Sequence, residues 1–437
     1  MTANVNMEIE DRIDRWVDGK AEHILQLNRS LVSVPSENRV PYGDETRVQE
    51  VVYGLLERFG CEMDRFTPDE VAGIKEHPAY LAGRHYENRF NVVGRKKGAG
   101  AGRSLLFSGH MDTVPRGDEP WSVDPFAGEV RDGKQYGLGI FDMKGGMVAA
   151  IAALQALDEL GIRLAGDVLI ETVVDEEYGG ANGTLAARLR GYKADVAIVP
   201  EPTNLTVSPE NQGGGMYRIT FHGKAGRSFS GEEPVNPVFA AARFLLLFRE
   251  YQAAHALKKP ASAWFSNDPG LTSYIQGVRA GAVHVPLQDR TPGTCSIDVW
   301  IQCYPETGED ELFDDFVSFM TRLSEADELL SGTDIRYEKL IRFLPGSGIP
   351  DGHDILPLTS AIGKRYYEQG LPVRGAAFAC DSFMFNLHSD TPAIVWGPKG
   401  GNAHAPDEFI DIEDFLNLVK MFAQTMVAWC GVAEVTA

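Results

Sequence analysis

The sequence predicts an α/β domain, built on a mainly parallel sheet with helices on both faces, into which a smaller α+β unit is inserted. Segments typical of strands and helices alternate over the first 210 residues, and the strands are almost continuously apolar, as in a parallel sheet covered on both faces. After Pro209 the pattern changes to half-apolar strands, and the first pattern resumes near residue 333. A chain of 437 residues also exceeds the size at which one hydrophobic core usually stops growing.

The first segment, residues 1–210, supplies most of the predicted parallel sheet. An alanine-rich stretch in its middle is a clear helix that a glycine-containing turn opens. The expected helices lie at 8–34, 44–59, 142–160 and 181–190, and the expected strands at 89–97, 103–112, 167–174 and 194–202.

The inserted unit is expected over residues 211–331. Its first strand alternates apolar and polar residues, which is typical of a half-exposed antiparallel strand. Its expected strands lie at 215–226, 271–286 and 293–305, and its expected helices at 235–256 and 309–326. The α/β domain then resumes over residues 332–437, with a strand just after 333, a helix at 356–369, a strand at 393–398 and a closing helix at 411–430.

Composition excludes several classes of partner. The hydrophobic content of 43% and charged content of 24% are ordinary for a globular protein. A net charge of -21 argues against nucleic acid or an anionic membrane surface as a partner. Five scattered cysteines without a Cys-x-x-Cys pair favour reduced thiols. The N-terminus is acidic, and the apolar run at 238–248 is short and interrupted by Arg243, too little to span a bilayer, so the expected location is the cytoplasm.

Residues able to bind metal ions follow several of the expected strands. In an open α/β sheet, ligands bind beyond the carboxyl ends of the strands, so these side chains are expected to meet. They are His110, Asp112, Asp142, Glu176, Glu177, Glu201 and, late in the chain, His404. Two imidazoles with several carboxylates suit a pair of divalent cations, and mixed nitrogen and oxygen ligands favour zinc, manganese or cobalt.

Five motifs give the chain a resemblance to the M20 metallopeptidase family. They occur in the order and approximate spacing of that family, over about residues 90 to 415. The motifs are SGHMDTVP (108–115), GLGIFDMKGG (137–146), DEEYGG (175–180), VPEPT (199–203) and GNAHAPDE (401–408). The resemblance implies a zinc-peptidase-like fold in which residues 211–331 form a lid and dimerisation domain.

The resemblance also implies a role for each candidate residue. Two metal sites would share the carboxylate of Asp142. His110 and Glu201 would complete one site, and Glu177 and His404 would complete the other. Glu176 resembles the general base, and Asp112 resembles the carboxylate that orients the first histidine. For Asp175 we favour a role as a strand-end cap or hydrogen-bond acceptor over direct contact with a metal.

The inserted unit departs from the family pattern at positions that bind substrate in relatives. Arg227 stands where a histidine usually follows the glycine, and two interpretations stay open: a cationic clamp for the substrate, or a surface arginine. Gln302 is a candidate for substrate contact that stands where many relatives have an arginine binding a substrate carboxylate through two bonds, and its presence disfavours a free α-carboxylate on the substrate. Arg279 and His284 are further candidates for substrate contact.

The sequence as a whole predicts a metal-dependent hydrolase, acting as a homodimer through its lid domain. The expected substrate is a small molecule with a C–N bond, such as the amide of an N-acyl amino acid or a short peptide, which water activated by two metal ions would attack. Two alternatives remain: an M20-like aminohydrolase acting on a non-peptide C–N bond such as an arylamine, and a catalytically inactive binding protein that retains the metal.

Overall fold

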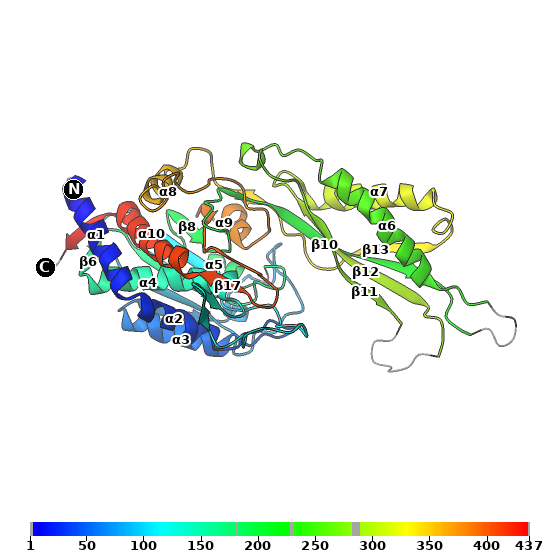
Figure 1. The fold of residues 1–437 in the computed structure, drawn as a ribbon, viewed down its shortest axis with the longest axis horizontal. Coiled ribbons are helices and arrows are strands. Elements are labelled where there is room, and N and C mark those ends of the chain that lie inside the picture. Colours follow the sequence, from blue (N-terminus) through cyan, green and yellow to red (C-terminus); the bar gives the residue numbers. More distant parts are fainter. Residues whose placement is uncertain (1–2, 181, 228–230, 232, 282–288, 436–437) are drawn as a thin grey trace. The chain divides into compact units, whose positions relative to one another are not determined.

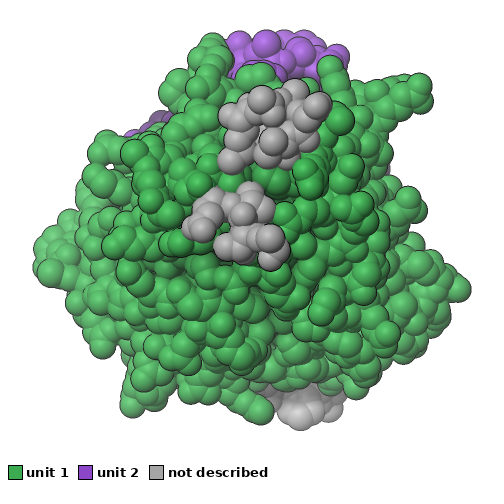
Figure 2. Space-filling view, turned by 90° about the vertical axis from the view of Figure 1, so that its left-hand side faces the viewer, with its two compact units in different colours: residues 1–210, 347–376, 380–437 green, residues 211–346, 377–379 purple. Residues whose placement is uncertain are grey.

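The computed structural model describes residues 3–180, 182–227, 231, 233–281 and 289–435. The chain folds into two compact units, which Figure 2 colours separately. The first unit comprises Met1–Glu210, Ser347–Ala376 and Cys380–Ala437, and the second comprises Asn211–Gly346 with Ala377–Ala379. The chain leaves the first unit at β9 (Glu210–Asn211) and re-enters it at β14 (Ser347–Gly348).

A six-stranded sheet forms the centre of the first unit (Figure 1). Its strands, in spatial order, are β1 (Glu62–Phe66), β2 (Asn91–Lys96), β7 (Val168–Val173), β3 (Leu105–His110), β8 (Val196–Val199) and β15 (Ala393–Val395). The four strands from β7 to β15 run parallel, and β1 and β2 are antiparallel additions at one edge. Every residue of β3, β7 and β8 is buried, as the apolar sequences predict for strands with both faces covered. The predicted α/β fold class is confirmed.

Helices cover this sheet and pack against one another. They are α1 (Ala3–Gly19), α2 (Ala21–Val32), α3 (Thr46–Arg58), α4 (Gly145–Glu159), α5 (Gly183–Leu189), α8 (Ile355–Gly363), α9 (Ser382–His388) and α10 (Ile412–Cys430). The ring of Phe422 on α10 joins the helices to the sheet, since its centroid lies 4.9 Å from that of Phe107 on β3. The helix predicted at 356–369 ends early, at Gly363, and a turn follows.

The core helix α4 is unusually apolar. Together with the preceding turn η2 (Ile140–Lys144), it forms the one segment of the described chain that is long and apolar enough to cross a membrane, with a mean hydropathy of 1.4. In the structure 94% of that segment is buried inside the unit. Its composition therefore reflects a helix enclosed by protein on all sides.

Small peripheral sheets complete the first unit. One joins β16 (Gly400–Gly401), β17 (Phe409–Asp411), β5 (Lys134–Tyr136) and β4 (Val130–Arg131) in that order. It brings the C-terminal loop 402–408 beside the segment that leads into η2. The second joins β6 (Ile162–Leu164) to β18 (Val432–Val435), and a short helical turn η1 (Pro68–Glu70) follows β1.

The second unit is a four-stranded antiparallel sheet with two helices. Its strands, in spatial order, are β11 (Ser273–Ala280), β12 (Thr294–Cys303), β10 (Gly213–His222) and β13 (Asp334–Lys339). The helices are α6 (Pro237–His255) and α7 (Glu309–Glu325), with a short turn η3 (Ala263–Phe265). Alternate residues of β10, such as Ile219 and Phe221, pack in one core with Phe244 of α6 and Phe316 of α7.

The second unit extends further along the chain than the sequence predicted. The strand expected after residue 333 exists, but it pairs with β10 in the second unit, so the boundary placed at residue 331 was wrong and lies at Gly346. Its sequence, DIRYEK, alternates polar and apolar residues, which suits the half-exposed edge of an antiparallel sheet rather than a covered parallel strand. The return of residues 377–379 to this unit had no sequence signal.

Candidate metal centre

The predicted ligands converge beyond the carboxyl ends of the central strands of the six-stranded sheet. His110 ends β3, and the acidic residues that follow β7 and β8 lie beside it because these strands are parallel neighbours. Asp142 comes from the η2 turn before α4, and His404 comes from the loop between β16 and β17. The residues concerned, all in the first unit, are His110, Asp112, Asp142, Glu176, Glu177, Glu201 and His404.

The Asp142 carboxylate lies between the two imidazoles. Its Oδ1 is 3.3 Å from Nε2 of His110, and its Oδ2 is 3.2 Å from Nε2 of His404. Each oxygen therefore faces a different histidine, which is the arrangement that a carboxylate shared by two metal ions requires. Burial would raise the pKa of Asp142, but hydrogen bonds to the two histidines hold it below its ordinary value.

Two ligand groups can be distinguished around this carboxylate. In the first, Oε1 of Glu201 lies 4.0 Å from Nε2 of His110, and Oε2 of Glu176 lies 3.9 Å from the same nitrogen. In the second, Oε2 of Glu177 lies 3.1 Å from Nε2 of His404, whose side chain is 51% exposed. Ligand atoms of His110, Asp142 and Glu177 also lie within 4.8 Å of one another, so the two groups are contiguous.

The charges of this cluster fit divalent cations. Burial, followed by the neighbouring carboxylates, raises the pKa of both Glu176 and Glu201 well above its ordinary value. Attraction by Glu177 raises the pKa of His404 in the same way. Ionised carboxylates packed this closely in a buried place repel one another, and bound cations relieve that repulsion. Imidazole nitrogens with carboxylate oxygens are also the donor set expected for zinc, manganese or cobalt.

The side chain of Asp112 makes different contacts from those the resemblance implied. Nδ1 of His110 lies 2.9 Å from the main-chain oxygen of Asp112 and 3.6 Å from its carboxylate. The carbonyl thus accepts the Nδ1 proton and leaves Nε2 facing the ligand group. The Asp112 carboxylate instead accepts the main-chain N–H groups of Glu176, at 3.2 Å, and Glu177, at 3.0 Å. It holds the loop that carries these two carboxylates.

Glu408 supports the centre and was missed by the sequence analysis. Its buried carboxylate accepts the main-chain N–H groups of Gly139 at 2.8 Å, Phe141 at 2.8 Å and Asp142 at 3.0 Å. Burial raises its pKa to about 8. The residue belongs to the GNAHAPDE motif that drew attention to His404, but its partners lie more than 260 positions away, so its role as their acceptor has no local signal.

A glycine lets the start of α4 approach the end of β8. A Cβ atom at Gly146 would lie 2.0 Å from the main-chain oxygen of Pro200, which no side chain permits. The close approach brings the turn with Asp142 beside Glu201. The glycines of this motif therefore serve packing at the centre.

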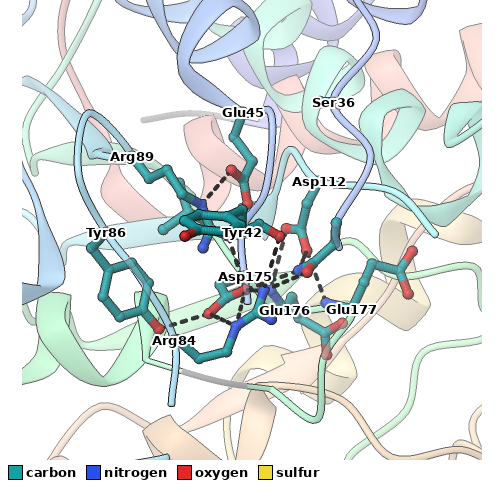
Figure 3. Close-up of polar contacts among 12 residues, drawn as sticks. Ser36, Tyr42, Glu45, Arg84, Tyr86, Arg89, Asp112, Asp175, Glu176 and Glu177 are labelled. Atoms are coloured by element: carbon teal, nitrogen blue, oxygen red, sulfur yellow. Dashed lines mark hydrogen bonds and ion pairs between the residues drawn. The ribbon is translucent and has the colours of Figure 1, made fainter. Parts of the chain in front are cut away.

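As predicted, Asp175 is a hydrogen-bond acceptor. Its carboxylate accepts bonds from Arg84 and Tyr86 (Figure 3).

Two of the residues predicted to bind substrate in the inserted unit form ion pairs. Arg227 pairs with the exposed side chain of Asp289. Arg279 lies on β11 and pairs with Asp298 of the neighbouring strand. His284 lies outside the described residues.

Gln302 is part of the interior of the second unit. It is 7% exposed, its Oε1 accepts the N–H of Thr272 at 3.1 Å, and its Nε2 donates to the main-chain oxygen of Ala377 at 2.7 Å. These bonds fasten the segments at 272 and 377 to β12. Gln302 therefore has a structural role within the unit, and its contact with substrate stays a prediction.

Comparison with known proteins agrees with this geometry. The sequence model of peptidase family M20/M25/M40 matches residues 106–428. A succinyl-diaminopimelate desuccinylase of Rhodospirillum centenum is 36% identical over 424 residues, which cover 94% of this chain and 98% of that protein. An N-formyl-4-amino-5-aminomethyl-2-methylpyrimidine deformylase of Bacillus subtilis is 25% identical over 443 residues, covering 96% and 97%.

Solved structures share the fold. A dinuclear metal-binding peptidase of the M20 family from Bacillus subtilis superposes with a TM-score of 0.58 and 16% sequence identity, covering 94% of this chain and 99% of that one.

Replacing Glu408 by Gln should weaken metal binding, because the turn that carries Asp142 loses part of its acceptor. Loss of a group that orients a ligand typically lowers metal affinity by about 10–100-fold, and Co²⁺ titration of the metal-free protein measures it. The matched control is Asp407→Asn, since Asp407 accepts a bond from Ser122 and not from that turn. Equal affinities in the two variants would contradict the supporting role of Glu408.

Proposed function

The chain belongs to peptidase family M20/M25/M40 and hydrolyses C–N bonds, and from this premise we propose that it removes the acyl group of an N-acylated amine with two divalent metal ions. The observation that carries the proposal is the carboxylate of Asp142, which offers one oxygen toward each of two imidazoles.

The proposed ligands follow the two groups around that carboxylate. Asp142 is shared, His110 and Glu201 complete one site, and Glu177 and His404 complete the other. Two bound cations would supply positive charge that lowers the pKa of a water molecule and polarises the carbonyl of the scissile amide. The mixed donor set supports zinc, with manganese and cobalt as alternatives, and the dinuclear peptidase of similar fold supports two ions.

Glu176 is the proposed general base. Its carboxylate lies beside His110, yet the shared carboxylate and the two ligand pairs are complete without it. A carboxylate there can take a proton from the attacking water and deliver it to the leaving nitrogen. Asp112 aids both steps, because its bonds to the main chain of residues 176 and 177 fix where the base sits.

An acyl amide is the proposed substrate class. The two curated relatives remove different acyl groups, formyl and succinyl, from amines. This shared reaction favours deacylation over hydrolysis of an arylamine.

We further propose a cytoplasmic homodimer that forms through the second unit. Exposed apolar side chains gather on its helix α6 and on the edge strand β11, two elements in contact; they are Val238, Phe239 and Leu246, and Tyr274, Ile275 and Val278. The five free cysteines support a reducing compartment.

Light scattering of the purified chain is expected to give the mass of a dimer, and Phe239→Glu with Leu246→Glu should lower it to that of a monomer, because buried charge opposes association. A monomer mass for the unaltered chain would contradict the proposed assembly.

The substitution Glu176→Gln tests the proposed reaction. Turnover on a panel of N-formyl, N-succinyl and N-acetyl amines, dipeptides and arylamines should fall by about 10²–10⁴-fold, the usual contribution of a general base. Metal content, measured by elemental analysis, should remain that of the unaltered protein.

Two controls separate the alternatives. Asp142→Asn should lose both metal and turnover, because both proposed sites share this carboxylate. An unaltered chain that turns over no member of the panel, with Glu176→Gln changing none of its properties, would instead identify a metal-retaining binding protein.

A further inference from the structure

A buried cluster of polar side chains surrounds Asp175, the residue immediately before Glu176 and Glu177. We call it the Asp175 hub, and it consists of Asp175, Arg84, Arg89, Tyr86 and Asn38. Figure 3 shows the arginines and the tyrosine converging on the central carboxylate. Tyr86 donates to its Oδ2 at 2.7 Å, Arg89 to its Oδ1 at 2.9 Å, and Asn38 to Oδ1 at 3.0 Å. Nε of Arg84 donates to both oxygens, at 2.9 and 3.0 Å.

Arg84 holds the acidic loop on both sides of the proposed base and ligand. Besides binding Asp175, its guanidinium carbon lies 4.6 Å from the centre of the Tyr178 ring. Asp175 precedes Glu176, and Tyr178 follows Glu177. One planar cation therefore contacts the residues immediately before and after the two acids, by hydrogen bonds on one side and by stacking on the other.

Arg84 reaches the same loop by a second route, through Asn38. Its Nη2 donates to the side-chain oxygen of Asn38, which turns the amide nitrogen of Asn38 toward two carboxylates. That nitrogen donates to Asp112 at 2.7 Å as well as to Asp175. Asp112 in turn accepts the main-chain N–H groups of Glu176 and Glu177.

We propose that Arg84 is a positioning residue that fixes Glu176 and Glu177 in the metal centre; the inference rests on the proposed function. The negative charge of Asp175 does not by itself require the contacts of Arg84, because Arg89 binds the same carboxylate. Among the residues that the structure describes, only Arg84 combines bonds to Asp175, a contact with Tyr178 and a bond to Asn38. Lysine keeps the charge but lacks the planar donors, so it cannot make all three contacts at once.

Arg89→Lys is a matched control. Arg89 is also buried and also binds Asp175, but its guanidinium is shared with Glu45, where Nε donates to Oε2 at 2.7 Å, and with the main-chain oxygen of His85 at 2.9 Å. The Glu45 contact directs Arg89 toward the N-terminus of α3, where Glu45 is the residue before the first helical turn. Both substitutions remove a buried guanidinium from the Asp175 carboxylate; Arg84→Lys also removes the contacts with Tyr178 and Asn38, whereas Arg89→Lys also removes the contact with Glu45.

Hydrogen exchange of the full chain, freed of metal by a chelator, tests the positioning without any substrate. Arg84→Lys should speed amide exchange in peptides containing residues 175–178 by about 10-fold or more, because local opening becomes easier. Arg89→Lys should leave the same peptides within about 2-fold of the unaltered protein. Exchange in these peptides that is the same in all three proteins, or faster in Arg89→Lys than in Arg84→Lys, would overturn the proposal.

Function provides the second readout. Arg84→Lys should lower Co²⁺ affinity by about 10–100-fold and lower kcat by about 10²-fold with KM within about 3-fold, because misplaced groups affect the chemical step most. If the unaltered chain binds no Co²⁺, the proposed function fails, whereas unchanged Co²⁺ affinity and kcat in Arg84→Lys refute only the role of Arg84.

If Arg84→Lys does not fold, Tyr178 gives a milder test. Tyr178→Leu removes the aromatic face that Arg84 contacts and should speed exchange at residues 175–178, while Tyr178→Phe keeps the face and should behave as the unaltered protein. Identical exchange in these two variants would overturn the proposal.

Discussion

Mutual repulsion among buried carboxylates is the constraint on which this structure depends. Two like charges about 4 Å apart repel by about 4 kcal/mol in surroundings of intermediate polarity, and several carboxylates meet around Asp142. The fold keeps them together by carrying each on a rigid element: the ends of β3, β7 and β8, the turn that opens α4, and the loop between β16 and β17. Other interactions in the fold offset the unfavourable repulsion energy of this cluster, and the cluster is suited to binding cations.

Each part of the centre has its own support. Glu408 holds the turn with Asp142, the carboxylate of Asp112 holds the main chain of Glu176 and Glu177, and the carbonyl of Asp112 holds His110. The Asp175 hub adds a further layer behind the acidic loop. Carboxylates thus have two kinds of surroundings here: some have oxygens that face the imidazoles and are the proposed metal ligands, and others accept main-chain N–H groups and hold the loops in place.

How far the sequence predicted this depended on the range of each signal. The covered strands were predicted because unbroken apolar runs are a local signal, and the residues brought together were found because they follow such strands. The strand β13 was assigned to the wrong unit, since strand pairing is set by partners more than 100 residues away. Gln302, Glu408 and Arg84 could not be understood from sequence for the same reason: what each side chain does is decided by its partners in space.

The most direct test of the account is anomalous scattering from crystals of the protein prepared with zinc, combined with elemental analysis of the same sample. The account predicts two peaks, one on each side of the Asp142 carboxylate and about 3.5–4 Å apart, with two zinc ions per chain. A single peak that Asp142 does not touch, or none at full occupancy with the site otherwise intact, would contradict it.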